Sequence, residues 1–295
     1  MYYRRKVLLA LIEAFGGRLE RTDCQKLLFL FCQYSKQNYY DFFPYKFGGF
    51  SLLAYHDKKR LTDLGHLNEG DEFKLRNPEQ SFFDQLKLKD RNALSHISSE
   101  FENLRGRDLI RRVYLNYPQF TCRSKIVSNV LSSKEIEQVS LWWNTDESPC
   151  LFTIGYEGLS IDAYLNKLIS NNVMVLIDVR KNPHSMKYGF SKSILQKYVK
   201  RAGLEYIHIP ELGIPSKLRQ NLNTPEAYRQ LFQFYETEIL PNSIDAVEKI
   251  KTLYAKFKRI ALTCFEADYN FCHRHKITGY LENSPNFDTK IVHLK

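Results

Sequence analysis

The stretch that decides the fold reads Arg259-Ile-Ala-Leu-Thr-Cys264-Phe-Glu266-Ala-Asp-Tyr-Asn-Phe-Cys272-His273-Arg274-His275. An apolar run ends on a cysteine, a glutamate follows two residues later, and a Cys-His-Arg triplet opens a helical pattern. This order predicts a buried strand, a loop and a helix, with the loop at the carboxyl end of the strand, where open α/β sheets place their ligands. Thiol, carboxylate, imidazole and guanidinium groups so close together indicate a functional site.

The same alternation of apolar strands and helical patterns covers the second half of the chain. Strands that alternate with helices form parallel sheets with right-handed crossovers. We therefore predict a parallel, Rossmann-like α/β domain over 149–295. The strands are expected at 151–154, 173–179, 206–209, 260–263 and 291–294, and the helices at 160–170, 192–202, 225–239, 243–257 and 274–282.

Residues 1–123 show helical periodicity instead. Helices are expected at 3–15, at 24–34 with Thr22 or Asp23 as the cap, at 50–61, 81–98 and 101–117. Three short helices followed by Gly65 and a polar hairpin tip at 68–72 predict a helical, winged-helix-like module. A serine-rich, charged segment at 124–148 is expected to be the connector.

The amino-acid composition excludes some classes of protein. No apolar run approaches the roughly 20 residues that span a bilayer, and no cleavage site follows the first apolar stretch, so we expect a cytoplasmic protein without a membrane partner. The net charge of +10 is spread over both halves: 23 basic and 19 acidic residues up to Cys150, 20 and 14 after it. This balance permits nucleic acid or a nucleotide as partner. Six cysteines in 295 residues do not form a disulfide scaffold.

Four of the expected strands end in polar or glycine-rich segments. Because parallel strands present their carboxyl ends at the same edge of a sheet, these segments are expected to meet there. The sequence therefore predicts one pocket that contains Arg180, Cys264, Glu266 and Arg274. The four segments are Gly155-Tyr156-Glu-Gly158, Asp178-Val-Arg180 with Ser185, His208-Ile-Pro210 and Cys264-Phe-Glu266.

The residue types suggest roles. The planar guanidinium of Arg180 suits a phosphate or carboxylate, and Glu266, between two apolar neighbours, is a candidate acid or base. Cys264 is a candidate nucleophile if a nearby cation lowers its pKa. Each also has a structural interpretation, as an ion pair or a core residue. The candidate catalytic residues are Glu266, Cys264 and Asp178, and the candidate ligand- or phosphate-binding residues are Gly155, Tyr156, Gly158, Arg180, Ser185, His208, Cys272, His273 and Arg274.

The same residues suggest two other chemistries. A zinc site would need Cys264, Cys272 and either His273 or His275, with His208 as a further ligand, but the seven-residue gap between the cysteines is unusual for zinc. No metal ligand is therefore assigned, and the cofactor is unknown. A rhodanese-like interpretation draws on the strand that ends in Asp-Val-Arg and on the strand-terminal cysteine, but the loop that returns an arginine soon after the cysteine is missing.

The second half closely resembles the domain-of-unknown-function 488 family over about residues 150–283. One departure is Lys187-Tyr188-Gly189-Phe190, where an arginine and a proline-rich turn are expected. The resemblance implies a fold and a site but no settled reaction. The shared stretches are Thr153-Ile-Gly-Tyr156, Asp178-Val-Arg180 with Pro183 and Ser185, Tyr206-Ile-His-Ile-Pro-Glu-Leu-Gly213, and Cys264-Phe-Glu266 with Cys272-His-Arg274.

The first half loosely resembles Panacea and SocA-like antitoxin domains. The matching stretches are Gln25-Lys-Leu-Leu-Phe29, Tyr45-Lys-Phe-Gly-Gly-Phe-Ser51 and the segment from Leu109 to Pro118. Gly48-Gly49 stands where those families usually have a Gly-Pro pair. The resemblance implies a helical interaction or DNA-associated module, and with it a partner protein and a role in phage defence.

These observations favour a nucleic-acid- or nucleotide-associated protein, an enzyme that acts on a phosphate-bearing ligand at the carboxyl edge of the α/β sheet. Two alternatives stay open: a non-catalytic regulator that senses a ligand, and a rhodanese-like thiol or sulfur-transfer enzyme. The sequence does not define the oligomeric state.

Overall fold

The computed structural model describes residues 1–295 apart from 220, 221, 286 and 295. The chain forms two compact units, Met1–Trp143 and Asn144–Lys295, and each has a hydrophobic core of its own. Within the described part of the chain, no helix is both long enough and apolar enough to cross a membrane.

Five helices surround the core of the N-terminal unit: α1 (Tyr3–Ala14), α2 (Arg21–Ser35), α3 (Leu52–Asp63), α4 (Leu88–Glu100) and α5 (Gly106–Asn116). The expected cap of the second helix was wrong. Helix α2 already begins at Arg21, so Thr22 and Asp23 lie in its first turn. The Asp23 carboxylate instead accepts a hydrogen bond from the main-chain N–H of Gly106, at 2.8 Å.

Short antiparallel pairs complete this unit. Strand β1 (Arg18–Leu19) pairs with β4 (Phe73–Lys74), and β2 (Phe43–Tyr45) pairs with β3 (Gly48–Phe50). An isolated antiparallel bridge joins Leu67 to Leu75, so the polar segment 68–72 lies at the tip of a hairpin.

The segment 124–148 contains two helices, α6 (Val127–Val130) and α7 (Ser133–Ser140). Their apolar side chains pack with Ile110 and Tyr114 of α5. The Nε1–H of Trp143 donates to the hydroxyl of Thr121 at 2.7 Å. The compact first unit therefore continues to Trp143.

The C-terminal unit contains a five-stranded parallel sheet with the order β7-β6-β8-β5-β9. All five expected strands are present, as the predicted Rossmann-like fold requires. Their bounds are β5 (Cys150–Gly155), β6 (Val175–Asp178), β7 (Glu205–His208), β8 (Arg259–Cys264) and β9 (Lys290–Leu294).

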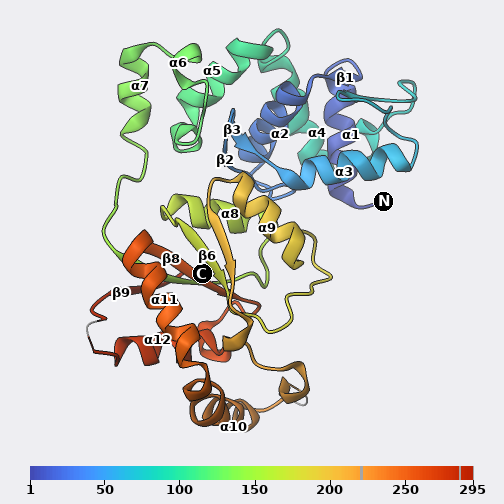
Figure 1. Cartoon of the computed structure of the whole chain (residues 1–295). Helices are drawn as coiled ribbons and strands as arrows, with labels where there is room; N and C mark the ends of the chain where they lie inside the picture. The colour runs from blue at the N-terminus through green and yellow to red at the C-terminus, as the bar shows by residue number, and fades with distance from the viewer. Residues whose placement is uncertain (220–221, 286, 295) are drawn as a thin grey trace. The chain divides into compact units, whose positions relative to one another are not determined.

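Helices cover both faces of this sheet, with α8 and α9 on one face and α11 and α12 on the other (Figure 1). Strand residues such as Ile177 and Leu262 pack with Val247 of α11 and Leu281 of α12 in one core. Burial on both faces explains why the strands are continuous apolar runs. The helices are α8 (Ile161–Ser170), α9 (Lys192–Arg201), α10 (Pro225–Phe234), α11 (Ile244–Phe257) and α12 (Arg274–Glu282).

The strand order positions the site. Chain connections lead from β6 outward to β7, and from β8 past β5 to β9. The adjacent strands β6 and β8 therefore send their connections in opposite directions. Such a topological switch point opens a crevice at the carboxyl ends of the two strands. Asp178 and Cys264 end these strands, and Asp178 pairs in register with Thr263.

Candidate functional site

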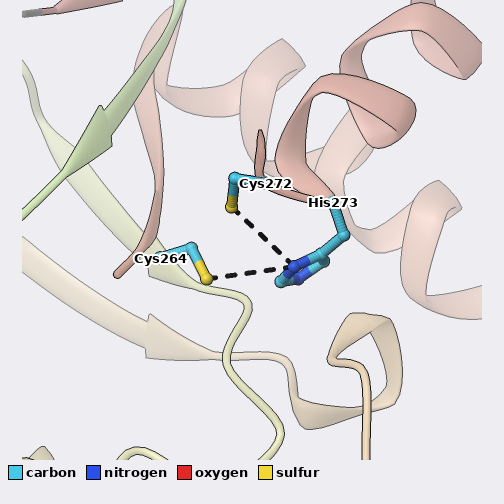
Figure 2. Close-up of side chains that lie close together, drawn as sticks. All are labelled: Cys264, Cys272 and His273. Atoms are coloured by element: carbon cyan, nitrogen blue, oxygen red, sulfur yellow. Dashed lines mark hydrogen bonds between the residues drawn. The ribbon is translucent and has the colours of Figure 1, made fainter. Parts of the chain in front are cut away.

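A cluster of two thiols and one imidazole lies at the carboxyl end of β8. Cys264 is the last residue of the strand, and Cys272 and His273 directly precede α12. Each sulfur lies 3.8 Å from Nδ1 of His273 (Figure 2). All three side chains are buried, with residue exposures of 0% for Cys264 and 1% for the other two. The structure thus brings together the predicted strand-end cysteine and two residues of the triplet that opens the following helix.

The hydrogen bond of Nε2, the second ring nitrogen of His273, determines the tautomer of the ring. Nε2 lies 3.2 Å from the carbonyl oxygen of Val179, to which it donates. Nδ1 is therefore the nitrogen that faces the sulfurs with its lone pair. The other two histidines weighed as metal ligands are engaged elsewhere: His275 Nδ1 with the carbonyl of Cys272 at 2.6 Å, and His208 Nε2 with the carbonyl of Arg180 at 2.8 Å.

Arg219 and Glu266 adjoin this cluster. The Arg219 guanidinium lies 3.3 Å from His273 Nδ1, 3.9 Å from Cys264 Sγ and 3.4 Å from Oε1 of Glu266. The other carboxylate oxygen of Glu266 is buried and has no hydrogen-bond partner among the described residues. Glu266 thus forms its ion pair with Arg219, and not with Arg274, whose guanidinium donates to main-chain carbonyls.

The surroundings shift the pKa values of Cys264, Cys272 and Glu266 in different directions. A hydrogen bond from Cys272 holds the pKa of Cys264 well below its usual value, and His273 and Arg219 act in the same direction. Burial raises the pKa of Cys272. Burial, together with the charge of Cys264, also raises the pKa of Glu266.

A pocket of about 290 Å³ opens next to Cys264, between the segments that follow β6 and β8. Cationic or polar donors provide most of its lining, and Cys264 forms part of it although its thiol is fully covered. This pocket lies at the switch point and gathers Lys181, Arg219 and several polar donors there. The lining consists of Tyr156, Arg180, Lys181, Asn182, His184, Ser185, Ile214, Ser216, Arg219, Cys264 and Phe265.

Asp178 and Arg180 form a buried bidentate ion pair, with Nε–Oδ1 and Nη2–Oδ2 distances of 2.8 and 2.6 Å. Arg180 Nη1 donates to the Tyr156 hydroxyl and to the carbonyl of Phe190. The Tyr206 hydroxyl adds a bond of 2.7 Å to Asp178. With most of its donors engaged, Arg180 shapes the wall of the pocket more than it offers hydrogen bonds to a ligand.

Arg274 holds the loop after β8. Its Nη1 donates to the carbonyl oxygen of Glu266 at 2.6 Å and its Nη2 to that of Ala267 at 3.1 Å. The residue is only 1% exposed and does not line the pocket. The structure therefore brings Arg180 and Cys264 to one pocket, with Glu266 beside it, but leaves Arg274 beneath the loop.

The remaining predicted residues have defined places. Gly155 allows a close backbone approach, because a Cβ there would lie 1.8 Å from the carbonyl oxygen of Glu266, whereas Gly158 serves a turn with φ +75°. Tyr156 stacks on Phe190 with ring centroids 4.4 Å apart. Ser185 caps its own loop through the main-chain N–H of Lys187.

Sequence reasoning missed Arg219, Lys181 and His184. Lys181 and His184 lie one and four residues after Arg180, so their place after a strand end was a usable signal. Arg219 ends the short 3-10 segment Ser216–Arg219, far along the chain from both strands. No periodicity or motif marks it, and only the tertiary fold brings it to Cys264.

This sheet, with ligand-type side chains at its switch point, defines a doubly wound α/β protein with a Cys-x-Glu and Cys-His-Arg site. Residues 160–281 match the family described as Domain of unknown function DUF488. Neither the curated proteins nor the solved structures gave a match.

Proposed function

We propose that this is a cytoplasmic enzyme that acts on a phosphate-bearing ligand, a nucleotide or the end of a nucleic acid. The pocket at the switch point is the observation that carries the proposal. Lys181 and Arg219 bring positive charge to it, and Asn182, Ser185 and Ser216 bring hydrogen-bond donors. Guanidinium and ammonium groups bind phosphate oxygens through charge-assisted hydrogen bonds.

The exposure and existing hydrogen bonds of the pocket residues suggest their roles. Lys181 is exposed, and Arg219 is held only by long hydrogen bonds, so both are available to a phosphate. Arg180 positions Tyr156 and the wall through the contacts that occupy it. Glu266 lies 3.4 Å from Arg219, so it is placed to take part in proton transfer to a ligand that Arg219 binds.

Binding can be tested by isothermal titration calorimetry with pyrophosphate, AMP and a 5′-phosphorylated oligonucleotide. Arg219→Gln and Lys181→Gln should each weaken binding at least about tenfold, the loss of one charge-assisted bond. Lys249→Gln, an exposed lysine of α11 outside the pocket, is the matched control. Equal affinities in all four proteins would contradict the assignment of the pocket.

Turnover separates an enzyme from a ligand-sensing regulator. The same compounds are incubated with the protein and the products are analysed by mass spectrometry. Glu266→Gln should keep the ligand affinity and lose about 10²–10⁴-fold in rate. Binding without conversion of any compound would favour the regulator.

We also propose that the N-terminal unit is a winged-helix-like interaction module with a role in phage defence. Two observations support it: the order α1-β1-α2-β2-β3-α3-β4, in which β1 pairs with β4 and a hairpin follows α3, and the meeting of the three stretches that resemble antitoxin domains. Lys26 donates to the carbonyl of Gly49, the Gln25 amide exchanges two hydrogen bonds with the main chain of Ser51, and Gly48 lies against Tyr114.

Nucleic acid is the partner that the net charge favours. The protein should be retained on heparin at low salt and released by about 0.5 M salt, since binding to a polyanion falls steeply as counterions compete. Passage through the column at low salt, or retention that does not change with salt, would argue against a nucleic-acid partner and leave a protein partner for the module.

A further inference from the structure

The most concentrated set of metal-binding atoms in the described part of the chain is the cluster of Cys264, Cys272 and His273. Their sulfur and Nδ1 atoms all lie within 4.8 Å of one another. A tetrahedral zinc ion, with bonds of about 2.3 Å to sulfur and about 2.0 Å to nitrogen, sets sulfur and nitrogen about 3.6 Å apart and two sulfurs about 3.8 Å apart. The two S–N distances of 3.8 Å are close to this value.

The imidazole of His273 is oriented by the kind of hydrogen bond that orients histidines in metal sites. Histidines that bind metals donate their other ring N–H to a carbonyl or carboxylate, which fixes the ring and the tautomer. His273 Nε2 donates in this way to Val179. Nδ1 is left with its lone pair directed between the two sulfurs, where Arg219 also approaches it at 3.3 Å.

The charges around the cluster also favour a bound cation. The guanidinium of Arg219 approaches both Nδ1 of His273 and Sγ of Cys264, so these atoms already attract a cationic group. A doubly charged ion balances two thiolates and a neutral imidazole, and Arg219 then balances Glu266, whose carboxylate lies 3.4 Å away. The buried Glu266 oxygen without a hydrogen-bond partner is a second polar group beside the cluster.

We infer that Cys264, Cys272 and His273 together bind one Zn²⁺ ion, with a fourth coordination position open to water or a ligand. Two thiolates and one imidazole suit zinc, and a three-ligand set with an open position is typical of catalytic rather than structural zinc sites. The use of the fourth position rests on the proposed function; the binding of the ion does not. The sequence had disfavoured zinc because of the gap between the cysteines, but the turn Tyr269–Phe271 folds that gap back to the strand end.

The test measures the metal itself in the full-length chain. Protein produced with zinc in the medium, kept reduced and dialysed, should contain about one Zn²⁺ per chain by mass spectrometry of the elements. Cobalt substitution should give the thiolate-to-metal charge-transfer band and the intense visible bands of a tetrahedral site. Cys272→Ser and His273→Gln should lose most of the metal and these bands.

Two matched controls keep their metal if the assignment is right. Cys150→Ser changes a buried cysteine at the opposite end of the sheet, and His275→Gln changes a histidine that already binds a carbonyl. A wild-type chain that takes up no zinc on reconstitution would overturn the inference. So would equal metal content in the ligand variants, or a Cys264–Cys272 disulfide in protein kept with zinc. The zinc measurement on the wild-type chain can overturn the inference by itself, so a variant that folds poorly does not leave the inference untested.

Arg219→Gln separates the two proposals. It should retain zinc, because Arg219 is not a ligand, while pyrophosphate binding weakens. Zinc at full occupancy with no affinity for any phosphate compound would refute the proposed function alone. Phosphate binding by a chain that cannot take up zinc would refute the metal site alone.

Discussion

Arg274 donates to the main-chain carbonyl of Glu266, at 2.6 Å, and not to its carboxylate. The arginine therefore fixes the path of the loop and leaves the acid to Arg219. The distinction matters because a buried guanidinium that binds two carbonyls is a structural element, whose removal leaves two buried acceptors without partners.

Arg274→Met should lower the free energy of unfolding by at least about 2 kcal/mol, because the carbonyls of Glu266 and Ala267 lose charged donors. Chemical denaturation measures the effect. Arg229→Gln removes an arginine whose side chain is 76% exposed and should change stability by less than about 0.5 kcal/mol. Equal effects of the two substitutions would show that the loop does not depend on Arg274.

Asp178→Asn should be more costly, since it leaves the buried Arg180 charge without its partner. Breaking one side of such a pair costs about 3–5 kcal/mol. The matched control is Glu248→Gln, which breaks an exposed pair with Lys251. If Asp178→Asn is as stable as this control, the pair does not support the pocket wall.

Gly155→Ala should disrupt the site, because the new methyl group would lie 1.8 Å from the carbonyl oxygen of Glu266. Gly279→Ala is the internal comparison: nothing lies within 4 Å of its Cβ position in α12, and alanine should stabilise that helix by about 0.5–1 kcal/mol. Opposite shifts of the melting temperature are expected. A stable Gly155→Ala protein would contradict the close approach.

Lys26 makes the stability of the N-terminal unit depend on pH. Burial lowers its pKa from 10.5 to about 7, so between these values the unfolded chain binds more protons than the folded one. The free energy of unfolding should therefore rise as the pH increases from 7 to about 8.5, by up to about 1.4 kcal/mol per unit.

Tryptophan fluorescence can follow this dependence, because both tryptophans, Trp142 and Trp143, belong to the N-terminal unit. Lys26→Met should flatten the rise, while Lys89→Met, at an exposed position of α4, should leave it in place. A flat profile in the wild-type chain would show that the ammonium is not desolvated in the fold.

The sequence predicts all five strands and the helices between them because buried parallel strands are unbroken apolar runs bounded by polar turns. The meeting of Cys264 with Cys272 and His273 follows from the position of these residues around one strand end. The hydrogen-bond partners do not follow, because they depend on side-chain direction. Arginine is a residue type that binds anions, but most donors of Arg274 and Arg180 already form hydrogen bonds within the protein.

Arg219 shows the other limit. It comes from a segment without periodicity, and nothing short of the tertiary structure relates it to a strand end 45 residues later. Residues that complete a site from a distant irregular segment leave no local pattern in a single sequence.

Two glycines on either side of the pocket have a consequence for evolution. Gly213 would place a Cβ 2.1 Å from the amide nitrogen of Lys181, much as Gly155 does against the loop of Glu266. The strand-end loops are thus joined backbone to backbone, without side chains as spacers. Selection from random libraries should accept variety at exposed lining positions such as His184 and Ser216, and return glycine at 155 and 213. Ligand preference can then diverge while the frame around Cys264, Cys272 and His273 stays constant.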